Sequence, residues 1–259
     1  MGYFSTEKRL YPRIGIEVPI TISNHTSSKT LNVSESGLCF ISDEVMLDGD
    51  LPVSLHLSSG PYDATMRIAW RKFLDKENKF FYGAEFVYSD LVGSNLREIL
   101  IKELIKDTLS LTEKLEVRDK ISEFFLRDLK SFLDAADEIS KEVRKKNSDK
   151  SVLMKRFKNI NDVIVLKGYE LEKSIQNKRV IKAIKESFRL LVSTLAYKSL
   201  IVKRAFEKPR GYPGDYGMIE NVYNNRPYSE GVGELYDKYF LRREDCHVFG
   251  IRDCQLKKI

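Results

Sequence analysis

The chain has 259 residues, with 44 Lys and Arg against 38 Asp and Glu, and a formal net charge of +6 at pH 7. Its first residues are polar, and no apolar run approaches the roughly 20 residues that cross a bilayer, so neither a secretory leader nor a membrane span is expected. Three scattered cysteines without a CxxC pair agree with a reducing compartment, and we expect a cytoplasmic protein.

The first part of the chain has the pattern of a small β-domain. Apolar and polar residues alternate at its start, the period of a strand with one buried face, with the apolar positions at Ile14, Ile16, Val18, Ile20 and Ile22. Further strand-like runs at 38–42, 51–57, 62–70 and 80–88 are separated by turn-forming residues. Such spacing predicts a barrel or a sandwich, closed by a helix from about residue 90 and ending near Asp107. Trp70 ends an apolar run and is expected in the core.

Beyond residue 107 the composition changes and the pattern becomes helical. Residues 1–107 carry a net charge of −3 and the remainder carries +9. Three apolar stripes with helical spacing run through residues 121–143, 153–175 and 180–202, which predicts three helices around one core. Breaks are expected at 147–149 and 176–177. Heptad-like spacing leaves self-association open, while solvated helix faces are the simpler alternative.

Two short motifs near the amino terminus carry the chemistry of anion and purine recognition. The first is Arg9-Leu-Tyr-Pro-Arg13, and the second is Asn32-Val-Ser34-Glu-Ser-Gly37. An Arg fork pairs with phosphate or with the O6 and N7 edge of guanine, and Asn can donate and accept toward the same edge. Each motif alone is common: a second RxxxR begins at Arg67, and the alternatives are a solvated basic start and an ordinary hairpin turn.

Together, in this order and spacing, the two motifs resemble a PilZ domain, a small β-barrel that binds cyclic di-GMP. The resemblance implies an α+β chain of two domains. Residues 1–107 would form a six-stranded antiparallel barrel with a closing helix, and residues 108–259 an α-helical, bundle-like domain. It also implies that Arg9, Arg13, Asn32, Ser34 and Gly37 bind the cyclic di-GMP, with the arginines on a flexible segment that becomes ordered over the ligand. A bacterial protein is expected.

A third motif, Lys208-Pro-Arg-Gly-Tyr-Pro-Gly-Asp215, combines turn-forming residues with aromatic and charged ones, which predicts an ordered loop. It resembles the loop upstream of the Rossmann domain in S-adenosylmethionine-dependent methyltransferases, some of which are fused to PilZ domains. Gly231-Val-Gly233 follows no buried strand and lacks the third glycine of a cofactor turn. Because the chain stops at Ile259, we infer a truncated chain, a shortened gene product or a lost catalytic half, and a structural or docking role for the loop.

Catalytic and metal-binding patterns are not recognisable in this sequence. The histidines are scattered, and Cys246, His247 and Cys254 lack both a fourth ligand and the spacing of a zinc module. We therefore expect no enzyme, but a cyclic di-GMP receptor that passes its signal to a helical output module, through a downstream protein or a homo-oligomer, without nucleic acid or membrane. The alternatives are the regulatory half of a methyltransferase and a PilZ-type scaffold that binds no nucleotide.

Overall fold

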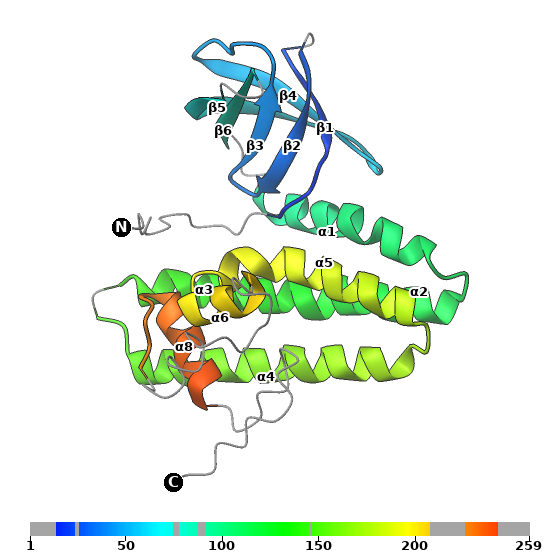
Figure 1. Cartoon of the computed structure of the whole chain (residues 1–259), viewed down its shortest axis with the longest axis vertical. Helices are drawn as coiled ribbons and strands as arrows, with labels where there is room; N and C mark the ends of the chain where they lie inside the picture. Colours follow the sequence, from blue (N-terminus) through cyan, green and yellow to red (C-terminus); the bar gives the residue numbers. More distant parts are fainter. Residues whose placement is uncertain are drawn as a thin grey trace. The chain divides into compact units, whose positions relative to one another are not determined.

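The computed structural model describes residues 14–23, 26–74, 78–87, 92–145, 147–207 and 226–242 (Figure 1). Packing divides the chain into two compact units. One comprises residues 11–127 and 175–191, and the other comprises residues 1–10, 128–174 and 192–259. Helix α5 (Lys178–Ala196) is divided between the two units, with residues up to Leu191 in one and residues from Val192 in the other. The domain boundary near residue 107 stays a prediction.

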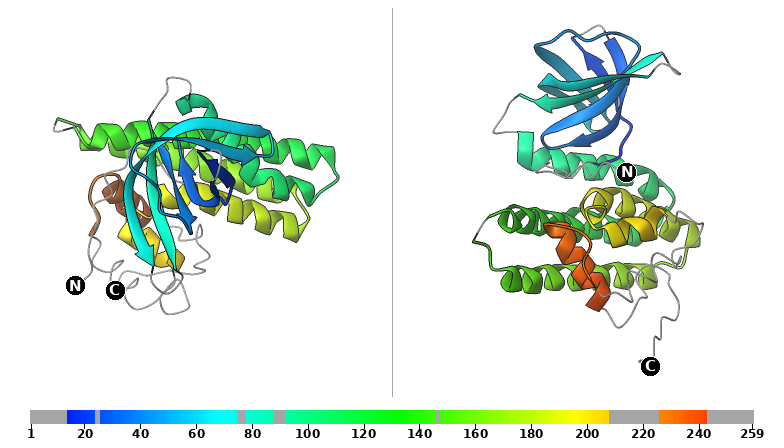
Figure 2. Two further views of the ribbon diagram at one scale, coloured as in Figure 1. Left: turned by 90° about the horizontal axis from the view of Figure 1, so that it is seen from above. Right: turned by 60° about the vertical axis from the view of Figure 1, so that its left-hand side comes forward.

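Six strands of the described residues close into an antiparallel barrel in the order β1-β2-β3-β6-β5-β4, which confirms the predicted fold. Figure 2 shows these strands from two further directions. The strands are β1 (Pro19–Ile22), β2 (Thr26–Ser34), β3 (Gly37–Ser42), β4 (Asp50–Leu57), β5 (Gly60–Leu74) and β6 (Lys79–Phe86). The alternating pattern did not mark β2, because its sequence TSSKTLNVS is mostly polar. Asn32 and Ser34 consequently lie in a strand, and the turn itself is Glu35-Ser36.

The interior of the barrel is filled by the predicted alternating residues and by an aromatic pair. The apolar side chains from Ile14 to Ile22 are at most 8% exposed. Phe40 and Tyr82 stack with their ring centroids 5.0 Å apart, and both are fully buried. The Tyr82 hydroxyl accepts a hydrogen bond from the Met46 backbone N–H at 2.9 Å and donates to the Glu44 carbonyl at 3.1 Å. The one polar group of this aromatic pair is therefore satisfied by the β3–β4 connection.

Trp70 does not lie in the core, contrary to the prediction. Its side chain is 41% exposed. The cause is a β-bulge between Ile68 and Trp70, where the register against β6 shifts so that Ile68 pairs with Ala84 and Trp70 pairs with Gly83. Without the extra residue, Trp70 would fall opposite Tyr82 and share its inward face; with it, the indole turns to the outer face.

Helix α1 (Val92–Ser110) is attached to the barrel by two charged contacts. Arg97 pairs with Glu35 of the β2–β3 turn at 2.5 Å, and their side chains are only 6% and 12% exposed. Glu103 accepts hydrogen bonds from the Ser58 backbone N–H at 2.8 Å, from the Ser58 hydroxyl and from Lys106. Burial acts to raise the pKa of Glu103, but the hydrogen bonds from Lys106 and Ser58 outweigh it and hold the pKa below its usual value.

The same unit contains α2 (Leu115–Glu123) and residues 178–191 of α5, which contact α1. The hydroxyls of Thr108 and Ser187 lie 3.2 Å apart in a buried contact, and the rings of Phe124 and Phe188 lie 6.2 Å apart. Phe124 begins a short π-helical segment, η1 (Phe124–Leu129), that leads toward the second unit. Residues almost eighty positions apart in the chain are thus joined in one core.

The second unit is helical. All three predicted stripes form helices, but those of residues 121–143 and 180–202 are each divided between the two units, so the prediction of three helices around one core was wrong. It contains α3 (Lys130–Val143), α4 (Lys150–Ser174), the end of α5, α6 (Leu200–Glu207) and α8 (Val232–Arg242). Both predicted breaks are confirmed. The Asp149 carboxylate caps α4 by accepting the Ser151 N–H at 2.8 Å, and the Asn177 side chain caps α5 by accepting the Arg179 N–H at 2.9 Å. None of the helices in the described residues is long and apolar enough to span a membrane.

Helix α8 was not predicted, and two glycines explain how it fits. Gly231, with φ +59°, turns the chain into the helix. A Cβ at Gly233 would lie 2.1 Å from the Lys198 carbonyl oxygen, so only glycine allows α8 to approach the α5–α6 connection this closely. Gly231 and Gly233 therefore serve as a helix start and a packing contact, and not as a cofactor turn.

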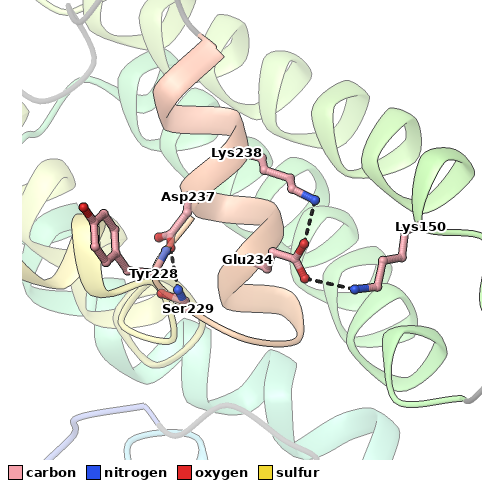
Figure 3. Close-up of polar contacts among 6 residues, drawn as sticks. All are labelled: Lys150, Tyr228, Ser229, Glu234, Asp237 and Lys238. Atoms are coloured by element: carbon pink, nitrogen blue, oxygen red, sulfur yellow. Dashed lines mark hydrogen bonds and ion pairs between the residues drawn. The ribbon is translucent and has the colours of Figure 1, made fainter. Parts of the chain in front are cut away.

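A buried carboxylate holds the start of α6 and the segment before α8 together. Asp237 is fully buried and accepts a hydrogen bond from the Ser199 hydroxyl at 2.5 Å. It also accepts hydrogen bonds from the backbone N–H groups of Tyr228 and Ser229 at 2.7 and 2.8 Å (Figure 3). The Ser199 hydroxyl in turn accepts the Val202 N–H at 3.0 Å. One side chain thus satisfies donors from two separate segments.

Replacing Asp237 by Asn should lower the free energy of unfolding by about 2–4 kcal/mol, because the amide NH2 would face backbone donors that now have a charged acceptor. Urea unfolding followed by far-ultraviolet circular dichroism measures the change. Asp134→Asn is the matched control, because its carboxylate is 47% exposed and pairs with Lys130 on the surface of α3; it should cost no more than about 0.5 kcal/mol. Equal losses of stability in the two variants would contradict the stabilising role of the buried Asp237 carboxylate.

Candidate functional site

A row of four residues crosses the outer face of the barrel from β2 to β5. Asn32 pairs with Cys39, Cys39 pairs with Gly83, and Gly83 pairs with Trp70. Directly paired residues project to the same face of a sheet, and these four alternate with residues that fill the interior. With strands about 4.8 Å apart, Asn32 and Trp70 stand roughly 14 Å from each other across the row.

Two β-bulges aim the ends of this row outward. On β2 the register against β3 shifts between Thr30 and Asn32, and on β5 it shifts between Ile68 and Trp70. In a regular strand Asn32 would share the inward face of Thr30, which is fully buried. The bulges instead place an amide and an indole on the outside of the barrel, the re-aiming that bulges beside binding sites often perform.

Trp70 lies against the backbone of Gly83. A Cβ at Gly83 would be 2.1 Å from Trp70 Nε1 and 2.2 Å from Cε2, so the indole occupies the space of the missing side chain. The remaining surface of the ring is open, with the side chain 41% exposed. An open indole face is suited to stacking on a planar base or on a guanidinium.

Ser34 and Gly37 close the β2–β3 hairpin beside this row. Ser34 is 3% exposed, and its hydroxyl donates to the Gly37 carbonyl at 3.1 Å and lies 3.3 Å from the Ser36 hydroxyl. A Cβ at Gly37 would lie 2.1 Å from the Ala84 carbonyl oxygen, so glycine is required for β3 to pass β6 at this point. Both residues therefore have a local structural reason, and they fix the turn that carries Glu35 to Arg97.

The chain that follows the two arginines is fastened to β2 at the same place. The Ile14 N–H donates to the Val33 carbonyl at 2.7 Å, and the Val33 N–H donates to the Ile14 carbonyl at 2.9 Å. Four residues on, the Thr30 hydroxyl donates to the Ile16 carbonyl at 2.7 Å and accepts the Val18 N–H at 2.8 Å. The chain thus reaches β2 between Asn32 and Ser34.

The structure therefore brings Asn32, Ser34 and Gly37 together at one end of the barrel and joins them to Ile14. Arg9 and Arg13 lie outside the described residues, as do the loop from Lys208 to Asp215 and the residues Cys246, His247 and Cys254. Within the described part, Arg67 and Arg71 of the second RxxxR are both exposed on β5. No group of three potential metal ligands occurs among the residues that the structure describes.

Three members of the row, Cys39, Gly83 and Trp70, were not predicted as site residues. A bulge is decided by sheet register, and neither the alternation nor the composition of residues 62–70 marks it. The usable signal was the glycine in Tyr82-Gly83-Ala84, because a glycine inside a strand often marks a close approach by another group. Here the approaching group is the only tryptophan of the chain.

Replacing Gly83 by Ala should displace the indole, because even a methyl group overlaps Nε1. Since Trp70 is the only tryptophan, its fluorescence reports the change directly; the emission should move to longer wavelength and become easier to quench with iodide. Gly15→Ala is the control, because its added methyl would make only an ordinary 3.7 Å contact with Leu190. Unchanged emission in a folded Gly83→Ala protein would contradict the packing.

Comparison with known proteins identifies the family of the amino-terminal barrel. The family model of the PilZ domain matches residues 7–102. No curated protein matches the chain. Among solved structures it is similar to the "Structure of Bacillus subtilis Inhibitor of motility (MotI/DgrA)", at 14% sequence identity and a TM-score of 0.33, over 39% of this chain. The match spans about half of that chain, 53% of its length. Residues 7–102 are accordingly a PilZ domain, the family that the two amino-terminal motifs resemble.

Proposed function

We propose that this chain is a receptor for cyclic di-GMP, and that Arg9, Arg13, Asn32, Ser34 and Gly37 form its binding site on the outer face of the barrel. PilZ domains in general are receptors for this nucleotide and bind without catalysing a reaction, and residues 7–102 are such a domain. The observation that carries the residue assignment is the pairing of Ile14 with Val33. It fastens the chain next to Arg13 between two of the proposed ligand-binding positions.

The chemistry of these residues fits a ligand with two guanines and two phosphates. Arg9 and Arg13 are separated by four residues, which span at most about 14 Å when extended, so two guanidinium forks can reach different parts of one compact ligand. Asn32 is partly exposed on the outer face and offers an amide to a purine edge. The open indole of Trp70, in the same row, adds a stacking surface for a base.

The charge distribution makes the arginines the main source of attraction. Residues 1–107 carry 12 Lys and Arg against 15 Asp and Glu, so the receptor half has no general positive field for an anionic ligand. Arg67, an exposed arginine of β5, pairs with Asp50 at 2.7 Å. Binding should therefore depend steeply on the two amino-terminal arginines.

Isothermal titration calorimetry of the full chain with cyclic di-GMP tests this proposal. Arg13→Ala should weaken binding by at least about tenfold, the loss expected for one charge-assisted hydrogen bond. Arg13→Lys should recover only part of that loss, because lysine keeps the charge but not the fork. Arg118→Ala, at an exposed position of α2, is the control and should bind like the parent. Failure of the parent chain to bind micromolar ligand would reject the receptor and favour a scaffold that binds no nucleotide.

We also propose that ligand binding is passed to the helical residues through the segment after Arg13. In support, Gly15 of that segment lies near Leu190, since a methyl added at Gly15 would meet Leu190 Cδ2 at 3.7 Å. Helix α5, which carries Leu190, belongs to both compact units. An ordered amino-terminal segment would therefore bear directly on a helix that the output region shares.

Limited proteolysis near residue 108, with and without cyclic di-GMP, tests this coupling separately. Bound ligand should slow cleavage of the parent chain and leave Arg13→Ala unchanged at the same ligand concentration. Calorimetric binding without any change in cleavage would keep the receptor and reject the coupling. A bacterial, cytoplasmic setting belongs to the same proposal, because cyclic di-GMP is chiefly a bacterial second messenger, and the helical residues would contact a downstream protein or a second copy of the chain.

A further inference from the structure

A pocket of about 480 Å³ lies between α4 and α8 in the helical unit. Its volume is within the range of small-molecule sites. Four ammonium groups and two hydroxyls surround it, contributed by Lys150, Ser151, Lys155, Lys158, Lys238 and Tyr239. The pocket is thus strongly cationic, and the amino-terminal half of α4 supplies most of it.

Helix packing fixes the two walls of this pocket. Four polar residues of α4 line the pocket, and they lie within about two turns of the helix, on one of its faces. Phe157 of α4 packs edge-to-face on Tyr236 and Tyr239 of α8, with ring centroids 4.5 and 6.3 Å apart. Phe157 is fully buried, so the aromatic contact anchors α8 against α4 beneath the cationic groups.

Two carboxylates hold the lining groups in place. Glu234 accepts hydrogen bonds from Lys238 at 2.6 Å and from Lys150 at 3.3 Å (Figure 3). Asp162 accepts from Lys158 at 2.7 Å and from the Tyr239 hydroxyl at 2.8 Å. Each ammonium has three donors, so lysines held in this way keep hydrogen bonds to give to a ligand.

The charges of the pocket do not cancel. Lys155 has no acidic partner among the residues that the structure describes. Four lysines against Glu234 and Asp162, the two carboxylates bonded to lining side chains, leave a charge of +2 among these groups; Asp149 accepts only backbone N–H groups of α4, those of Ser151 and Val152. The hydrogen bond from Lys238 and, secondarily, that from Lys150 outweigh burial and lower the pKa of Glu234, so this carboxylate stays ionised near neutral pH.

We infer that this pocket binds a small molecule through a phosphomonoester group. A phosphomonoester carries nearly two negative charges at pH 7 and presents several acceptor oxygens, which matches both the residual charge and the surplus donors. Lysine is a common phosphate ligand that acts as a point charge. A carboxylate-bearing segment offers one charge per group and would leave the site half neutralised. The site is separate from the barrel and does not depend on the proposed cyclic di-GMP binding.

Calorimetric titration of the full chain with ribose 5-phosphate tests the inference, with ribose as the uncharged comparison. Saturable binding of the phosphate ester and none of ribose is expected. Lys155→Gln should weaken binding by at least about tenfold. Lys167→Gln, an exposed lysine of the same helix that pairs with Glu170 outside the pocket, is matched in charge and should change the affinity less than about twofold. Arg13→Ala should bind like the parent.

The pH dependence separates a dianion from a general anion. The second pKa of a phosphomonoester is about 6, so its affinity should fall about fourfold between pH 7.5 and pH 5.5, while sulfate, a dianion at both values, keeps its affinity. No histidine is among the described lining residues, and Lys150, Lys155, Lys158, Lys238, Asp162, Glu234 and Tyr239 are the charged or titratable groups that face the site. No saturable binding at millimolar ester, or equal losses in the two lysine variants, would overturn the inference.

Discussion

The antiparallel pairing of Ile14 with Val33 is the contact on which the organisation of the barrel end depends. Two backbone hydrogen bonds, of 2.7 and 2.9 Å, place the start of the described chain in the middle of the proposed site. The Thr30 hydroxyl extends this attachment, because it donates to the Ile16 carbonyl and accepts the Val18 N–H. Because backbone groups make the connection, it constrains where the chain runs without specifying side chains beyond a buried Ile14.

The features that depend on local sequence were predictable. The buried face from Ile14 to Ile22 and the helical character of residues 121–143, 153–175 and 180–202 follow from periodicity, and both are confirmed. The single core expected for these helices is wrong, because two of the stripes are divided between the units. The helix starts at Asp149 and Asn177 were also readable, because a short polar side chain at the first position accepts the free backbone donors of the first turn. For the site, the motif residues Asn32, Ser34 and Gly37 do lie at one hairpin.

The features that depend on pairing between distant strands were not predictable. Strand β2 is mostly polar, so its sequence shows no clear alternation. It is recognised as a strand only from its pairing with β1 and β3. The outward position of Trp70 arises from one extra residue in β5, which reverses the face of everything after it. The same holds for Asn32, whose exposure comes from a bulge and not from its place in the motif. The motif predicted Asn32 as a ligand-binding residue but could not predict where its side chain lies. Trp70 is not part of the motif and was expected in the core.

The sharing of α5 between the two compact units has a consequence for dissecting the molecule. Residues 175–191 complete the core that contains Thr108 and Phe124, although they follow α3 and α4 of the other unit in the chain. A fragment that ends soon after the barrel would lack residues 175–191 and would expose this apolar surface to water. A fragment that begins after the barrel would contain α5, but residues 178–191 of that helix would have lost the side chains that they pack against. The roles of the barrel unit and of the helical unit are therefore better separated by point substitutions than by truncation, and the unfolding of the two units should be coupled through helix α5.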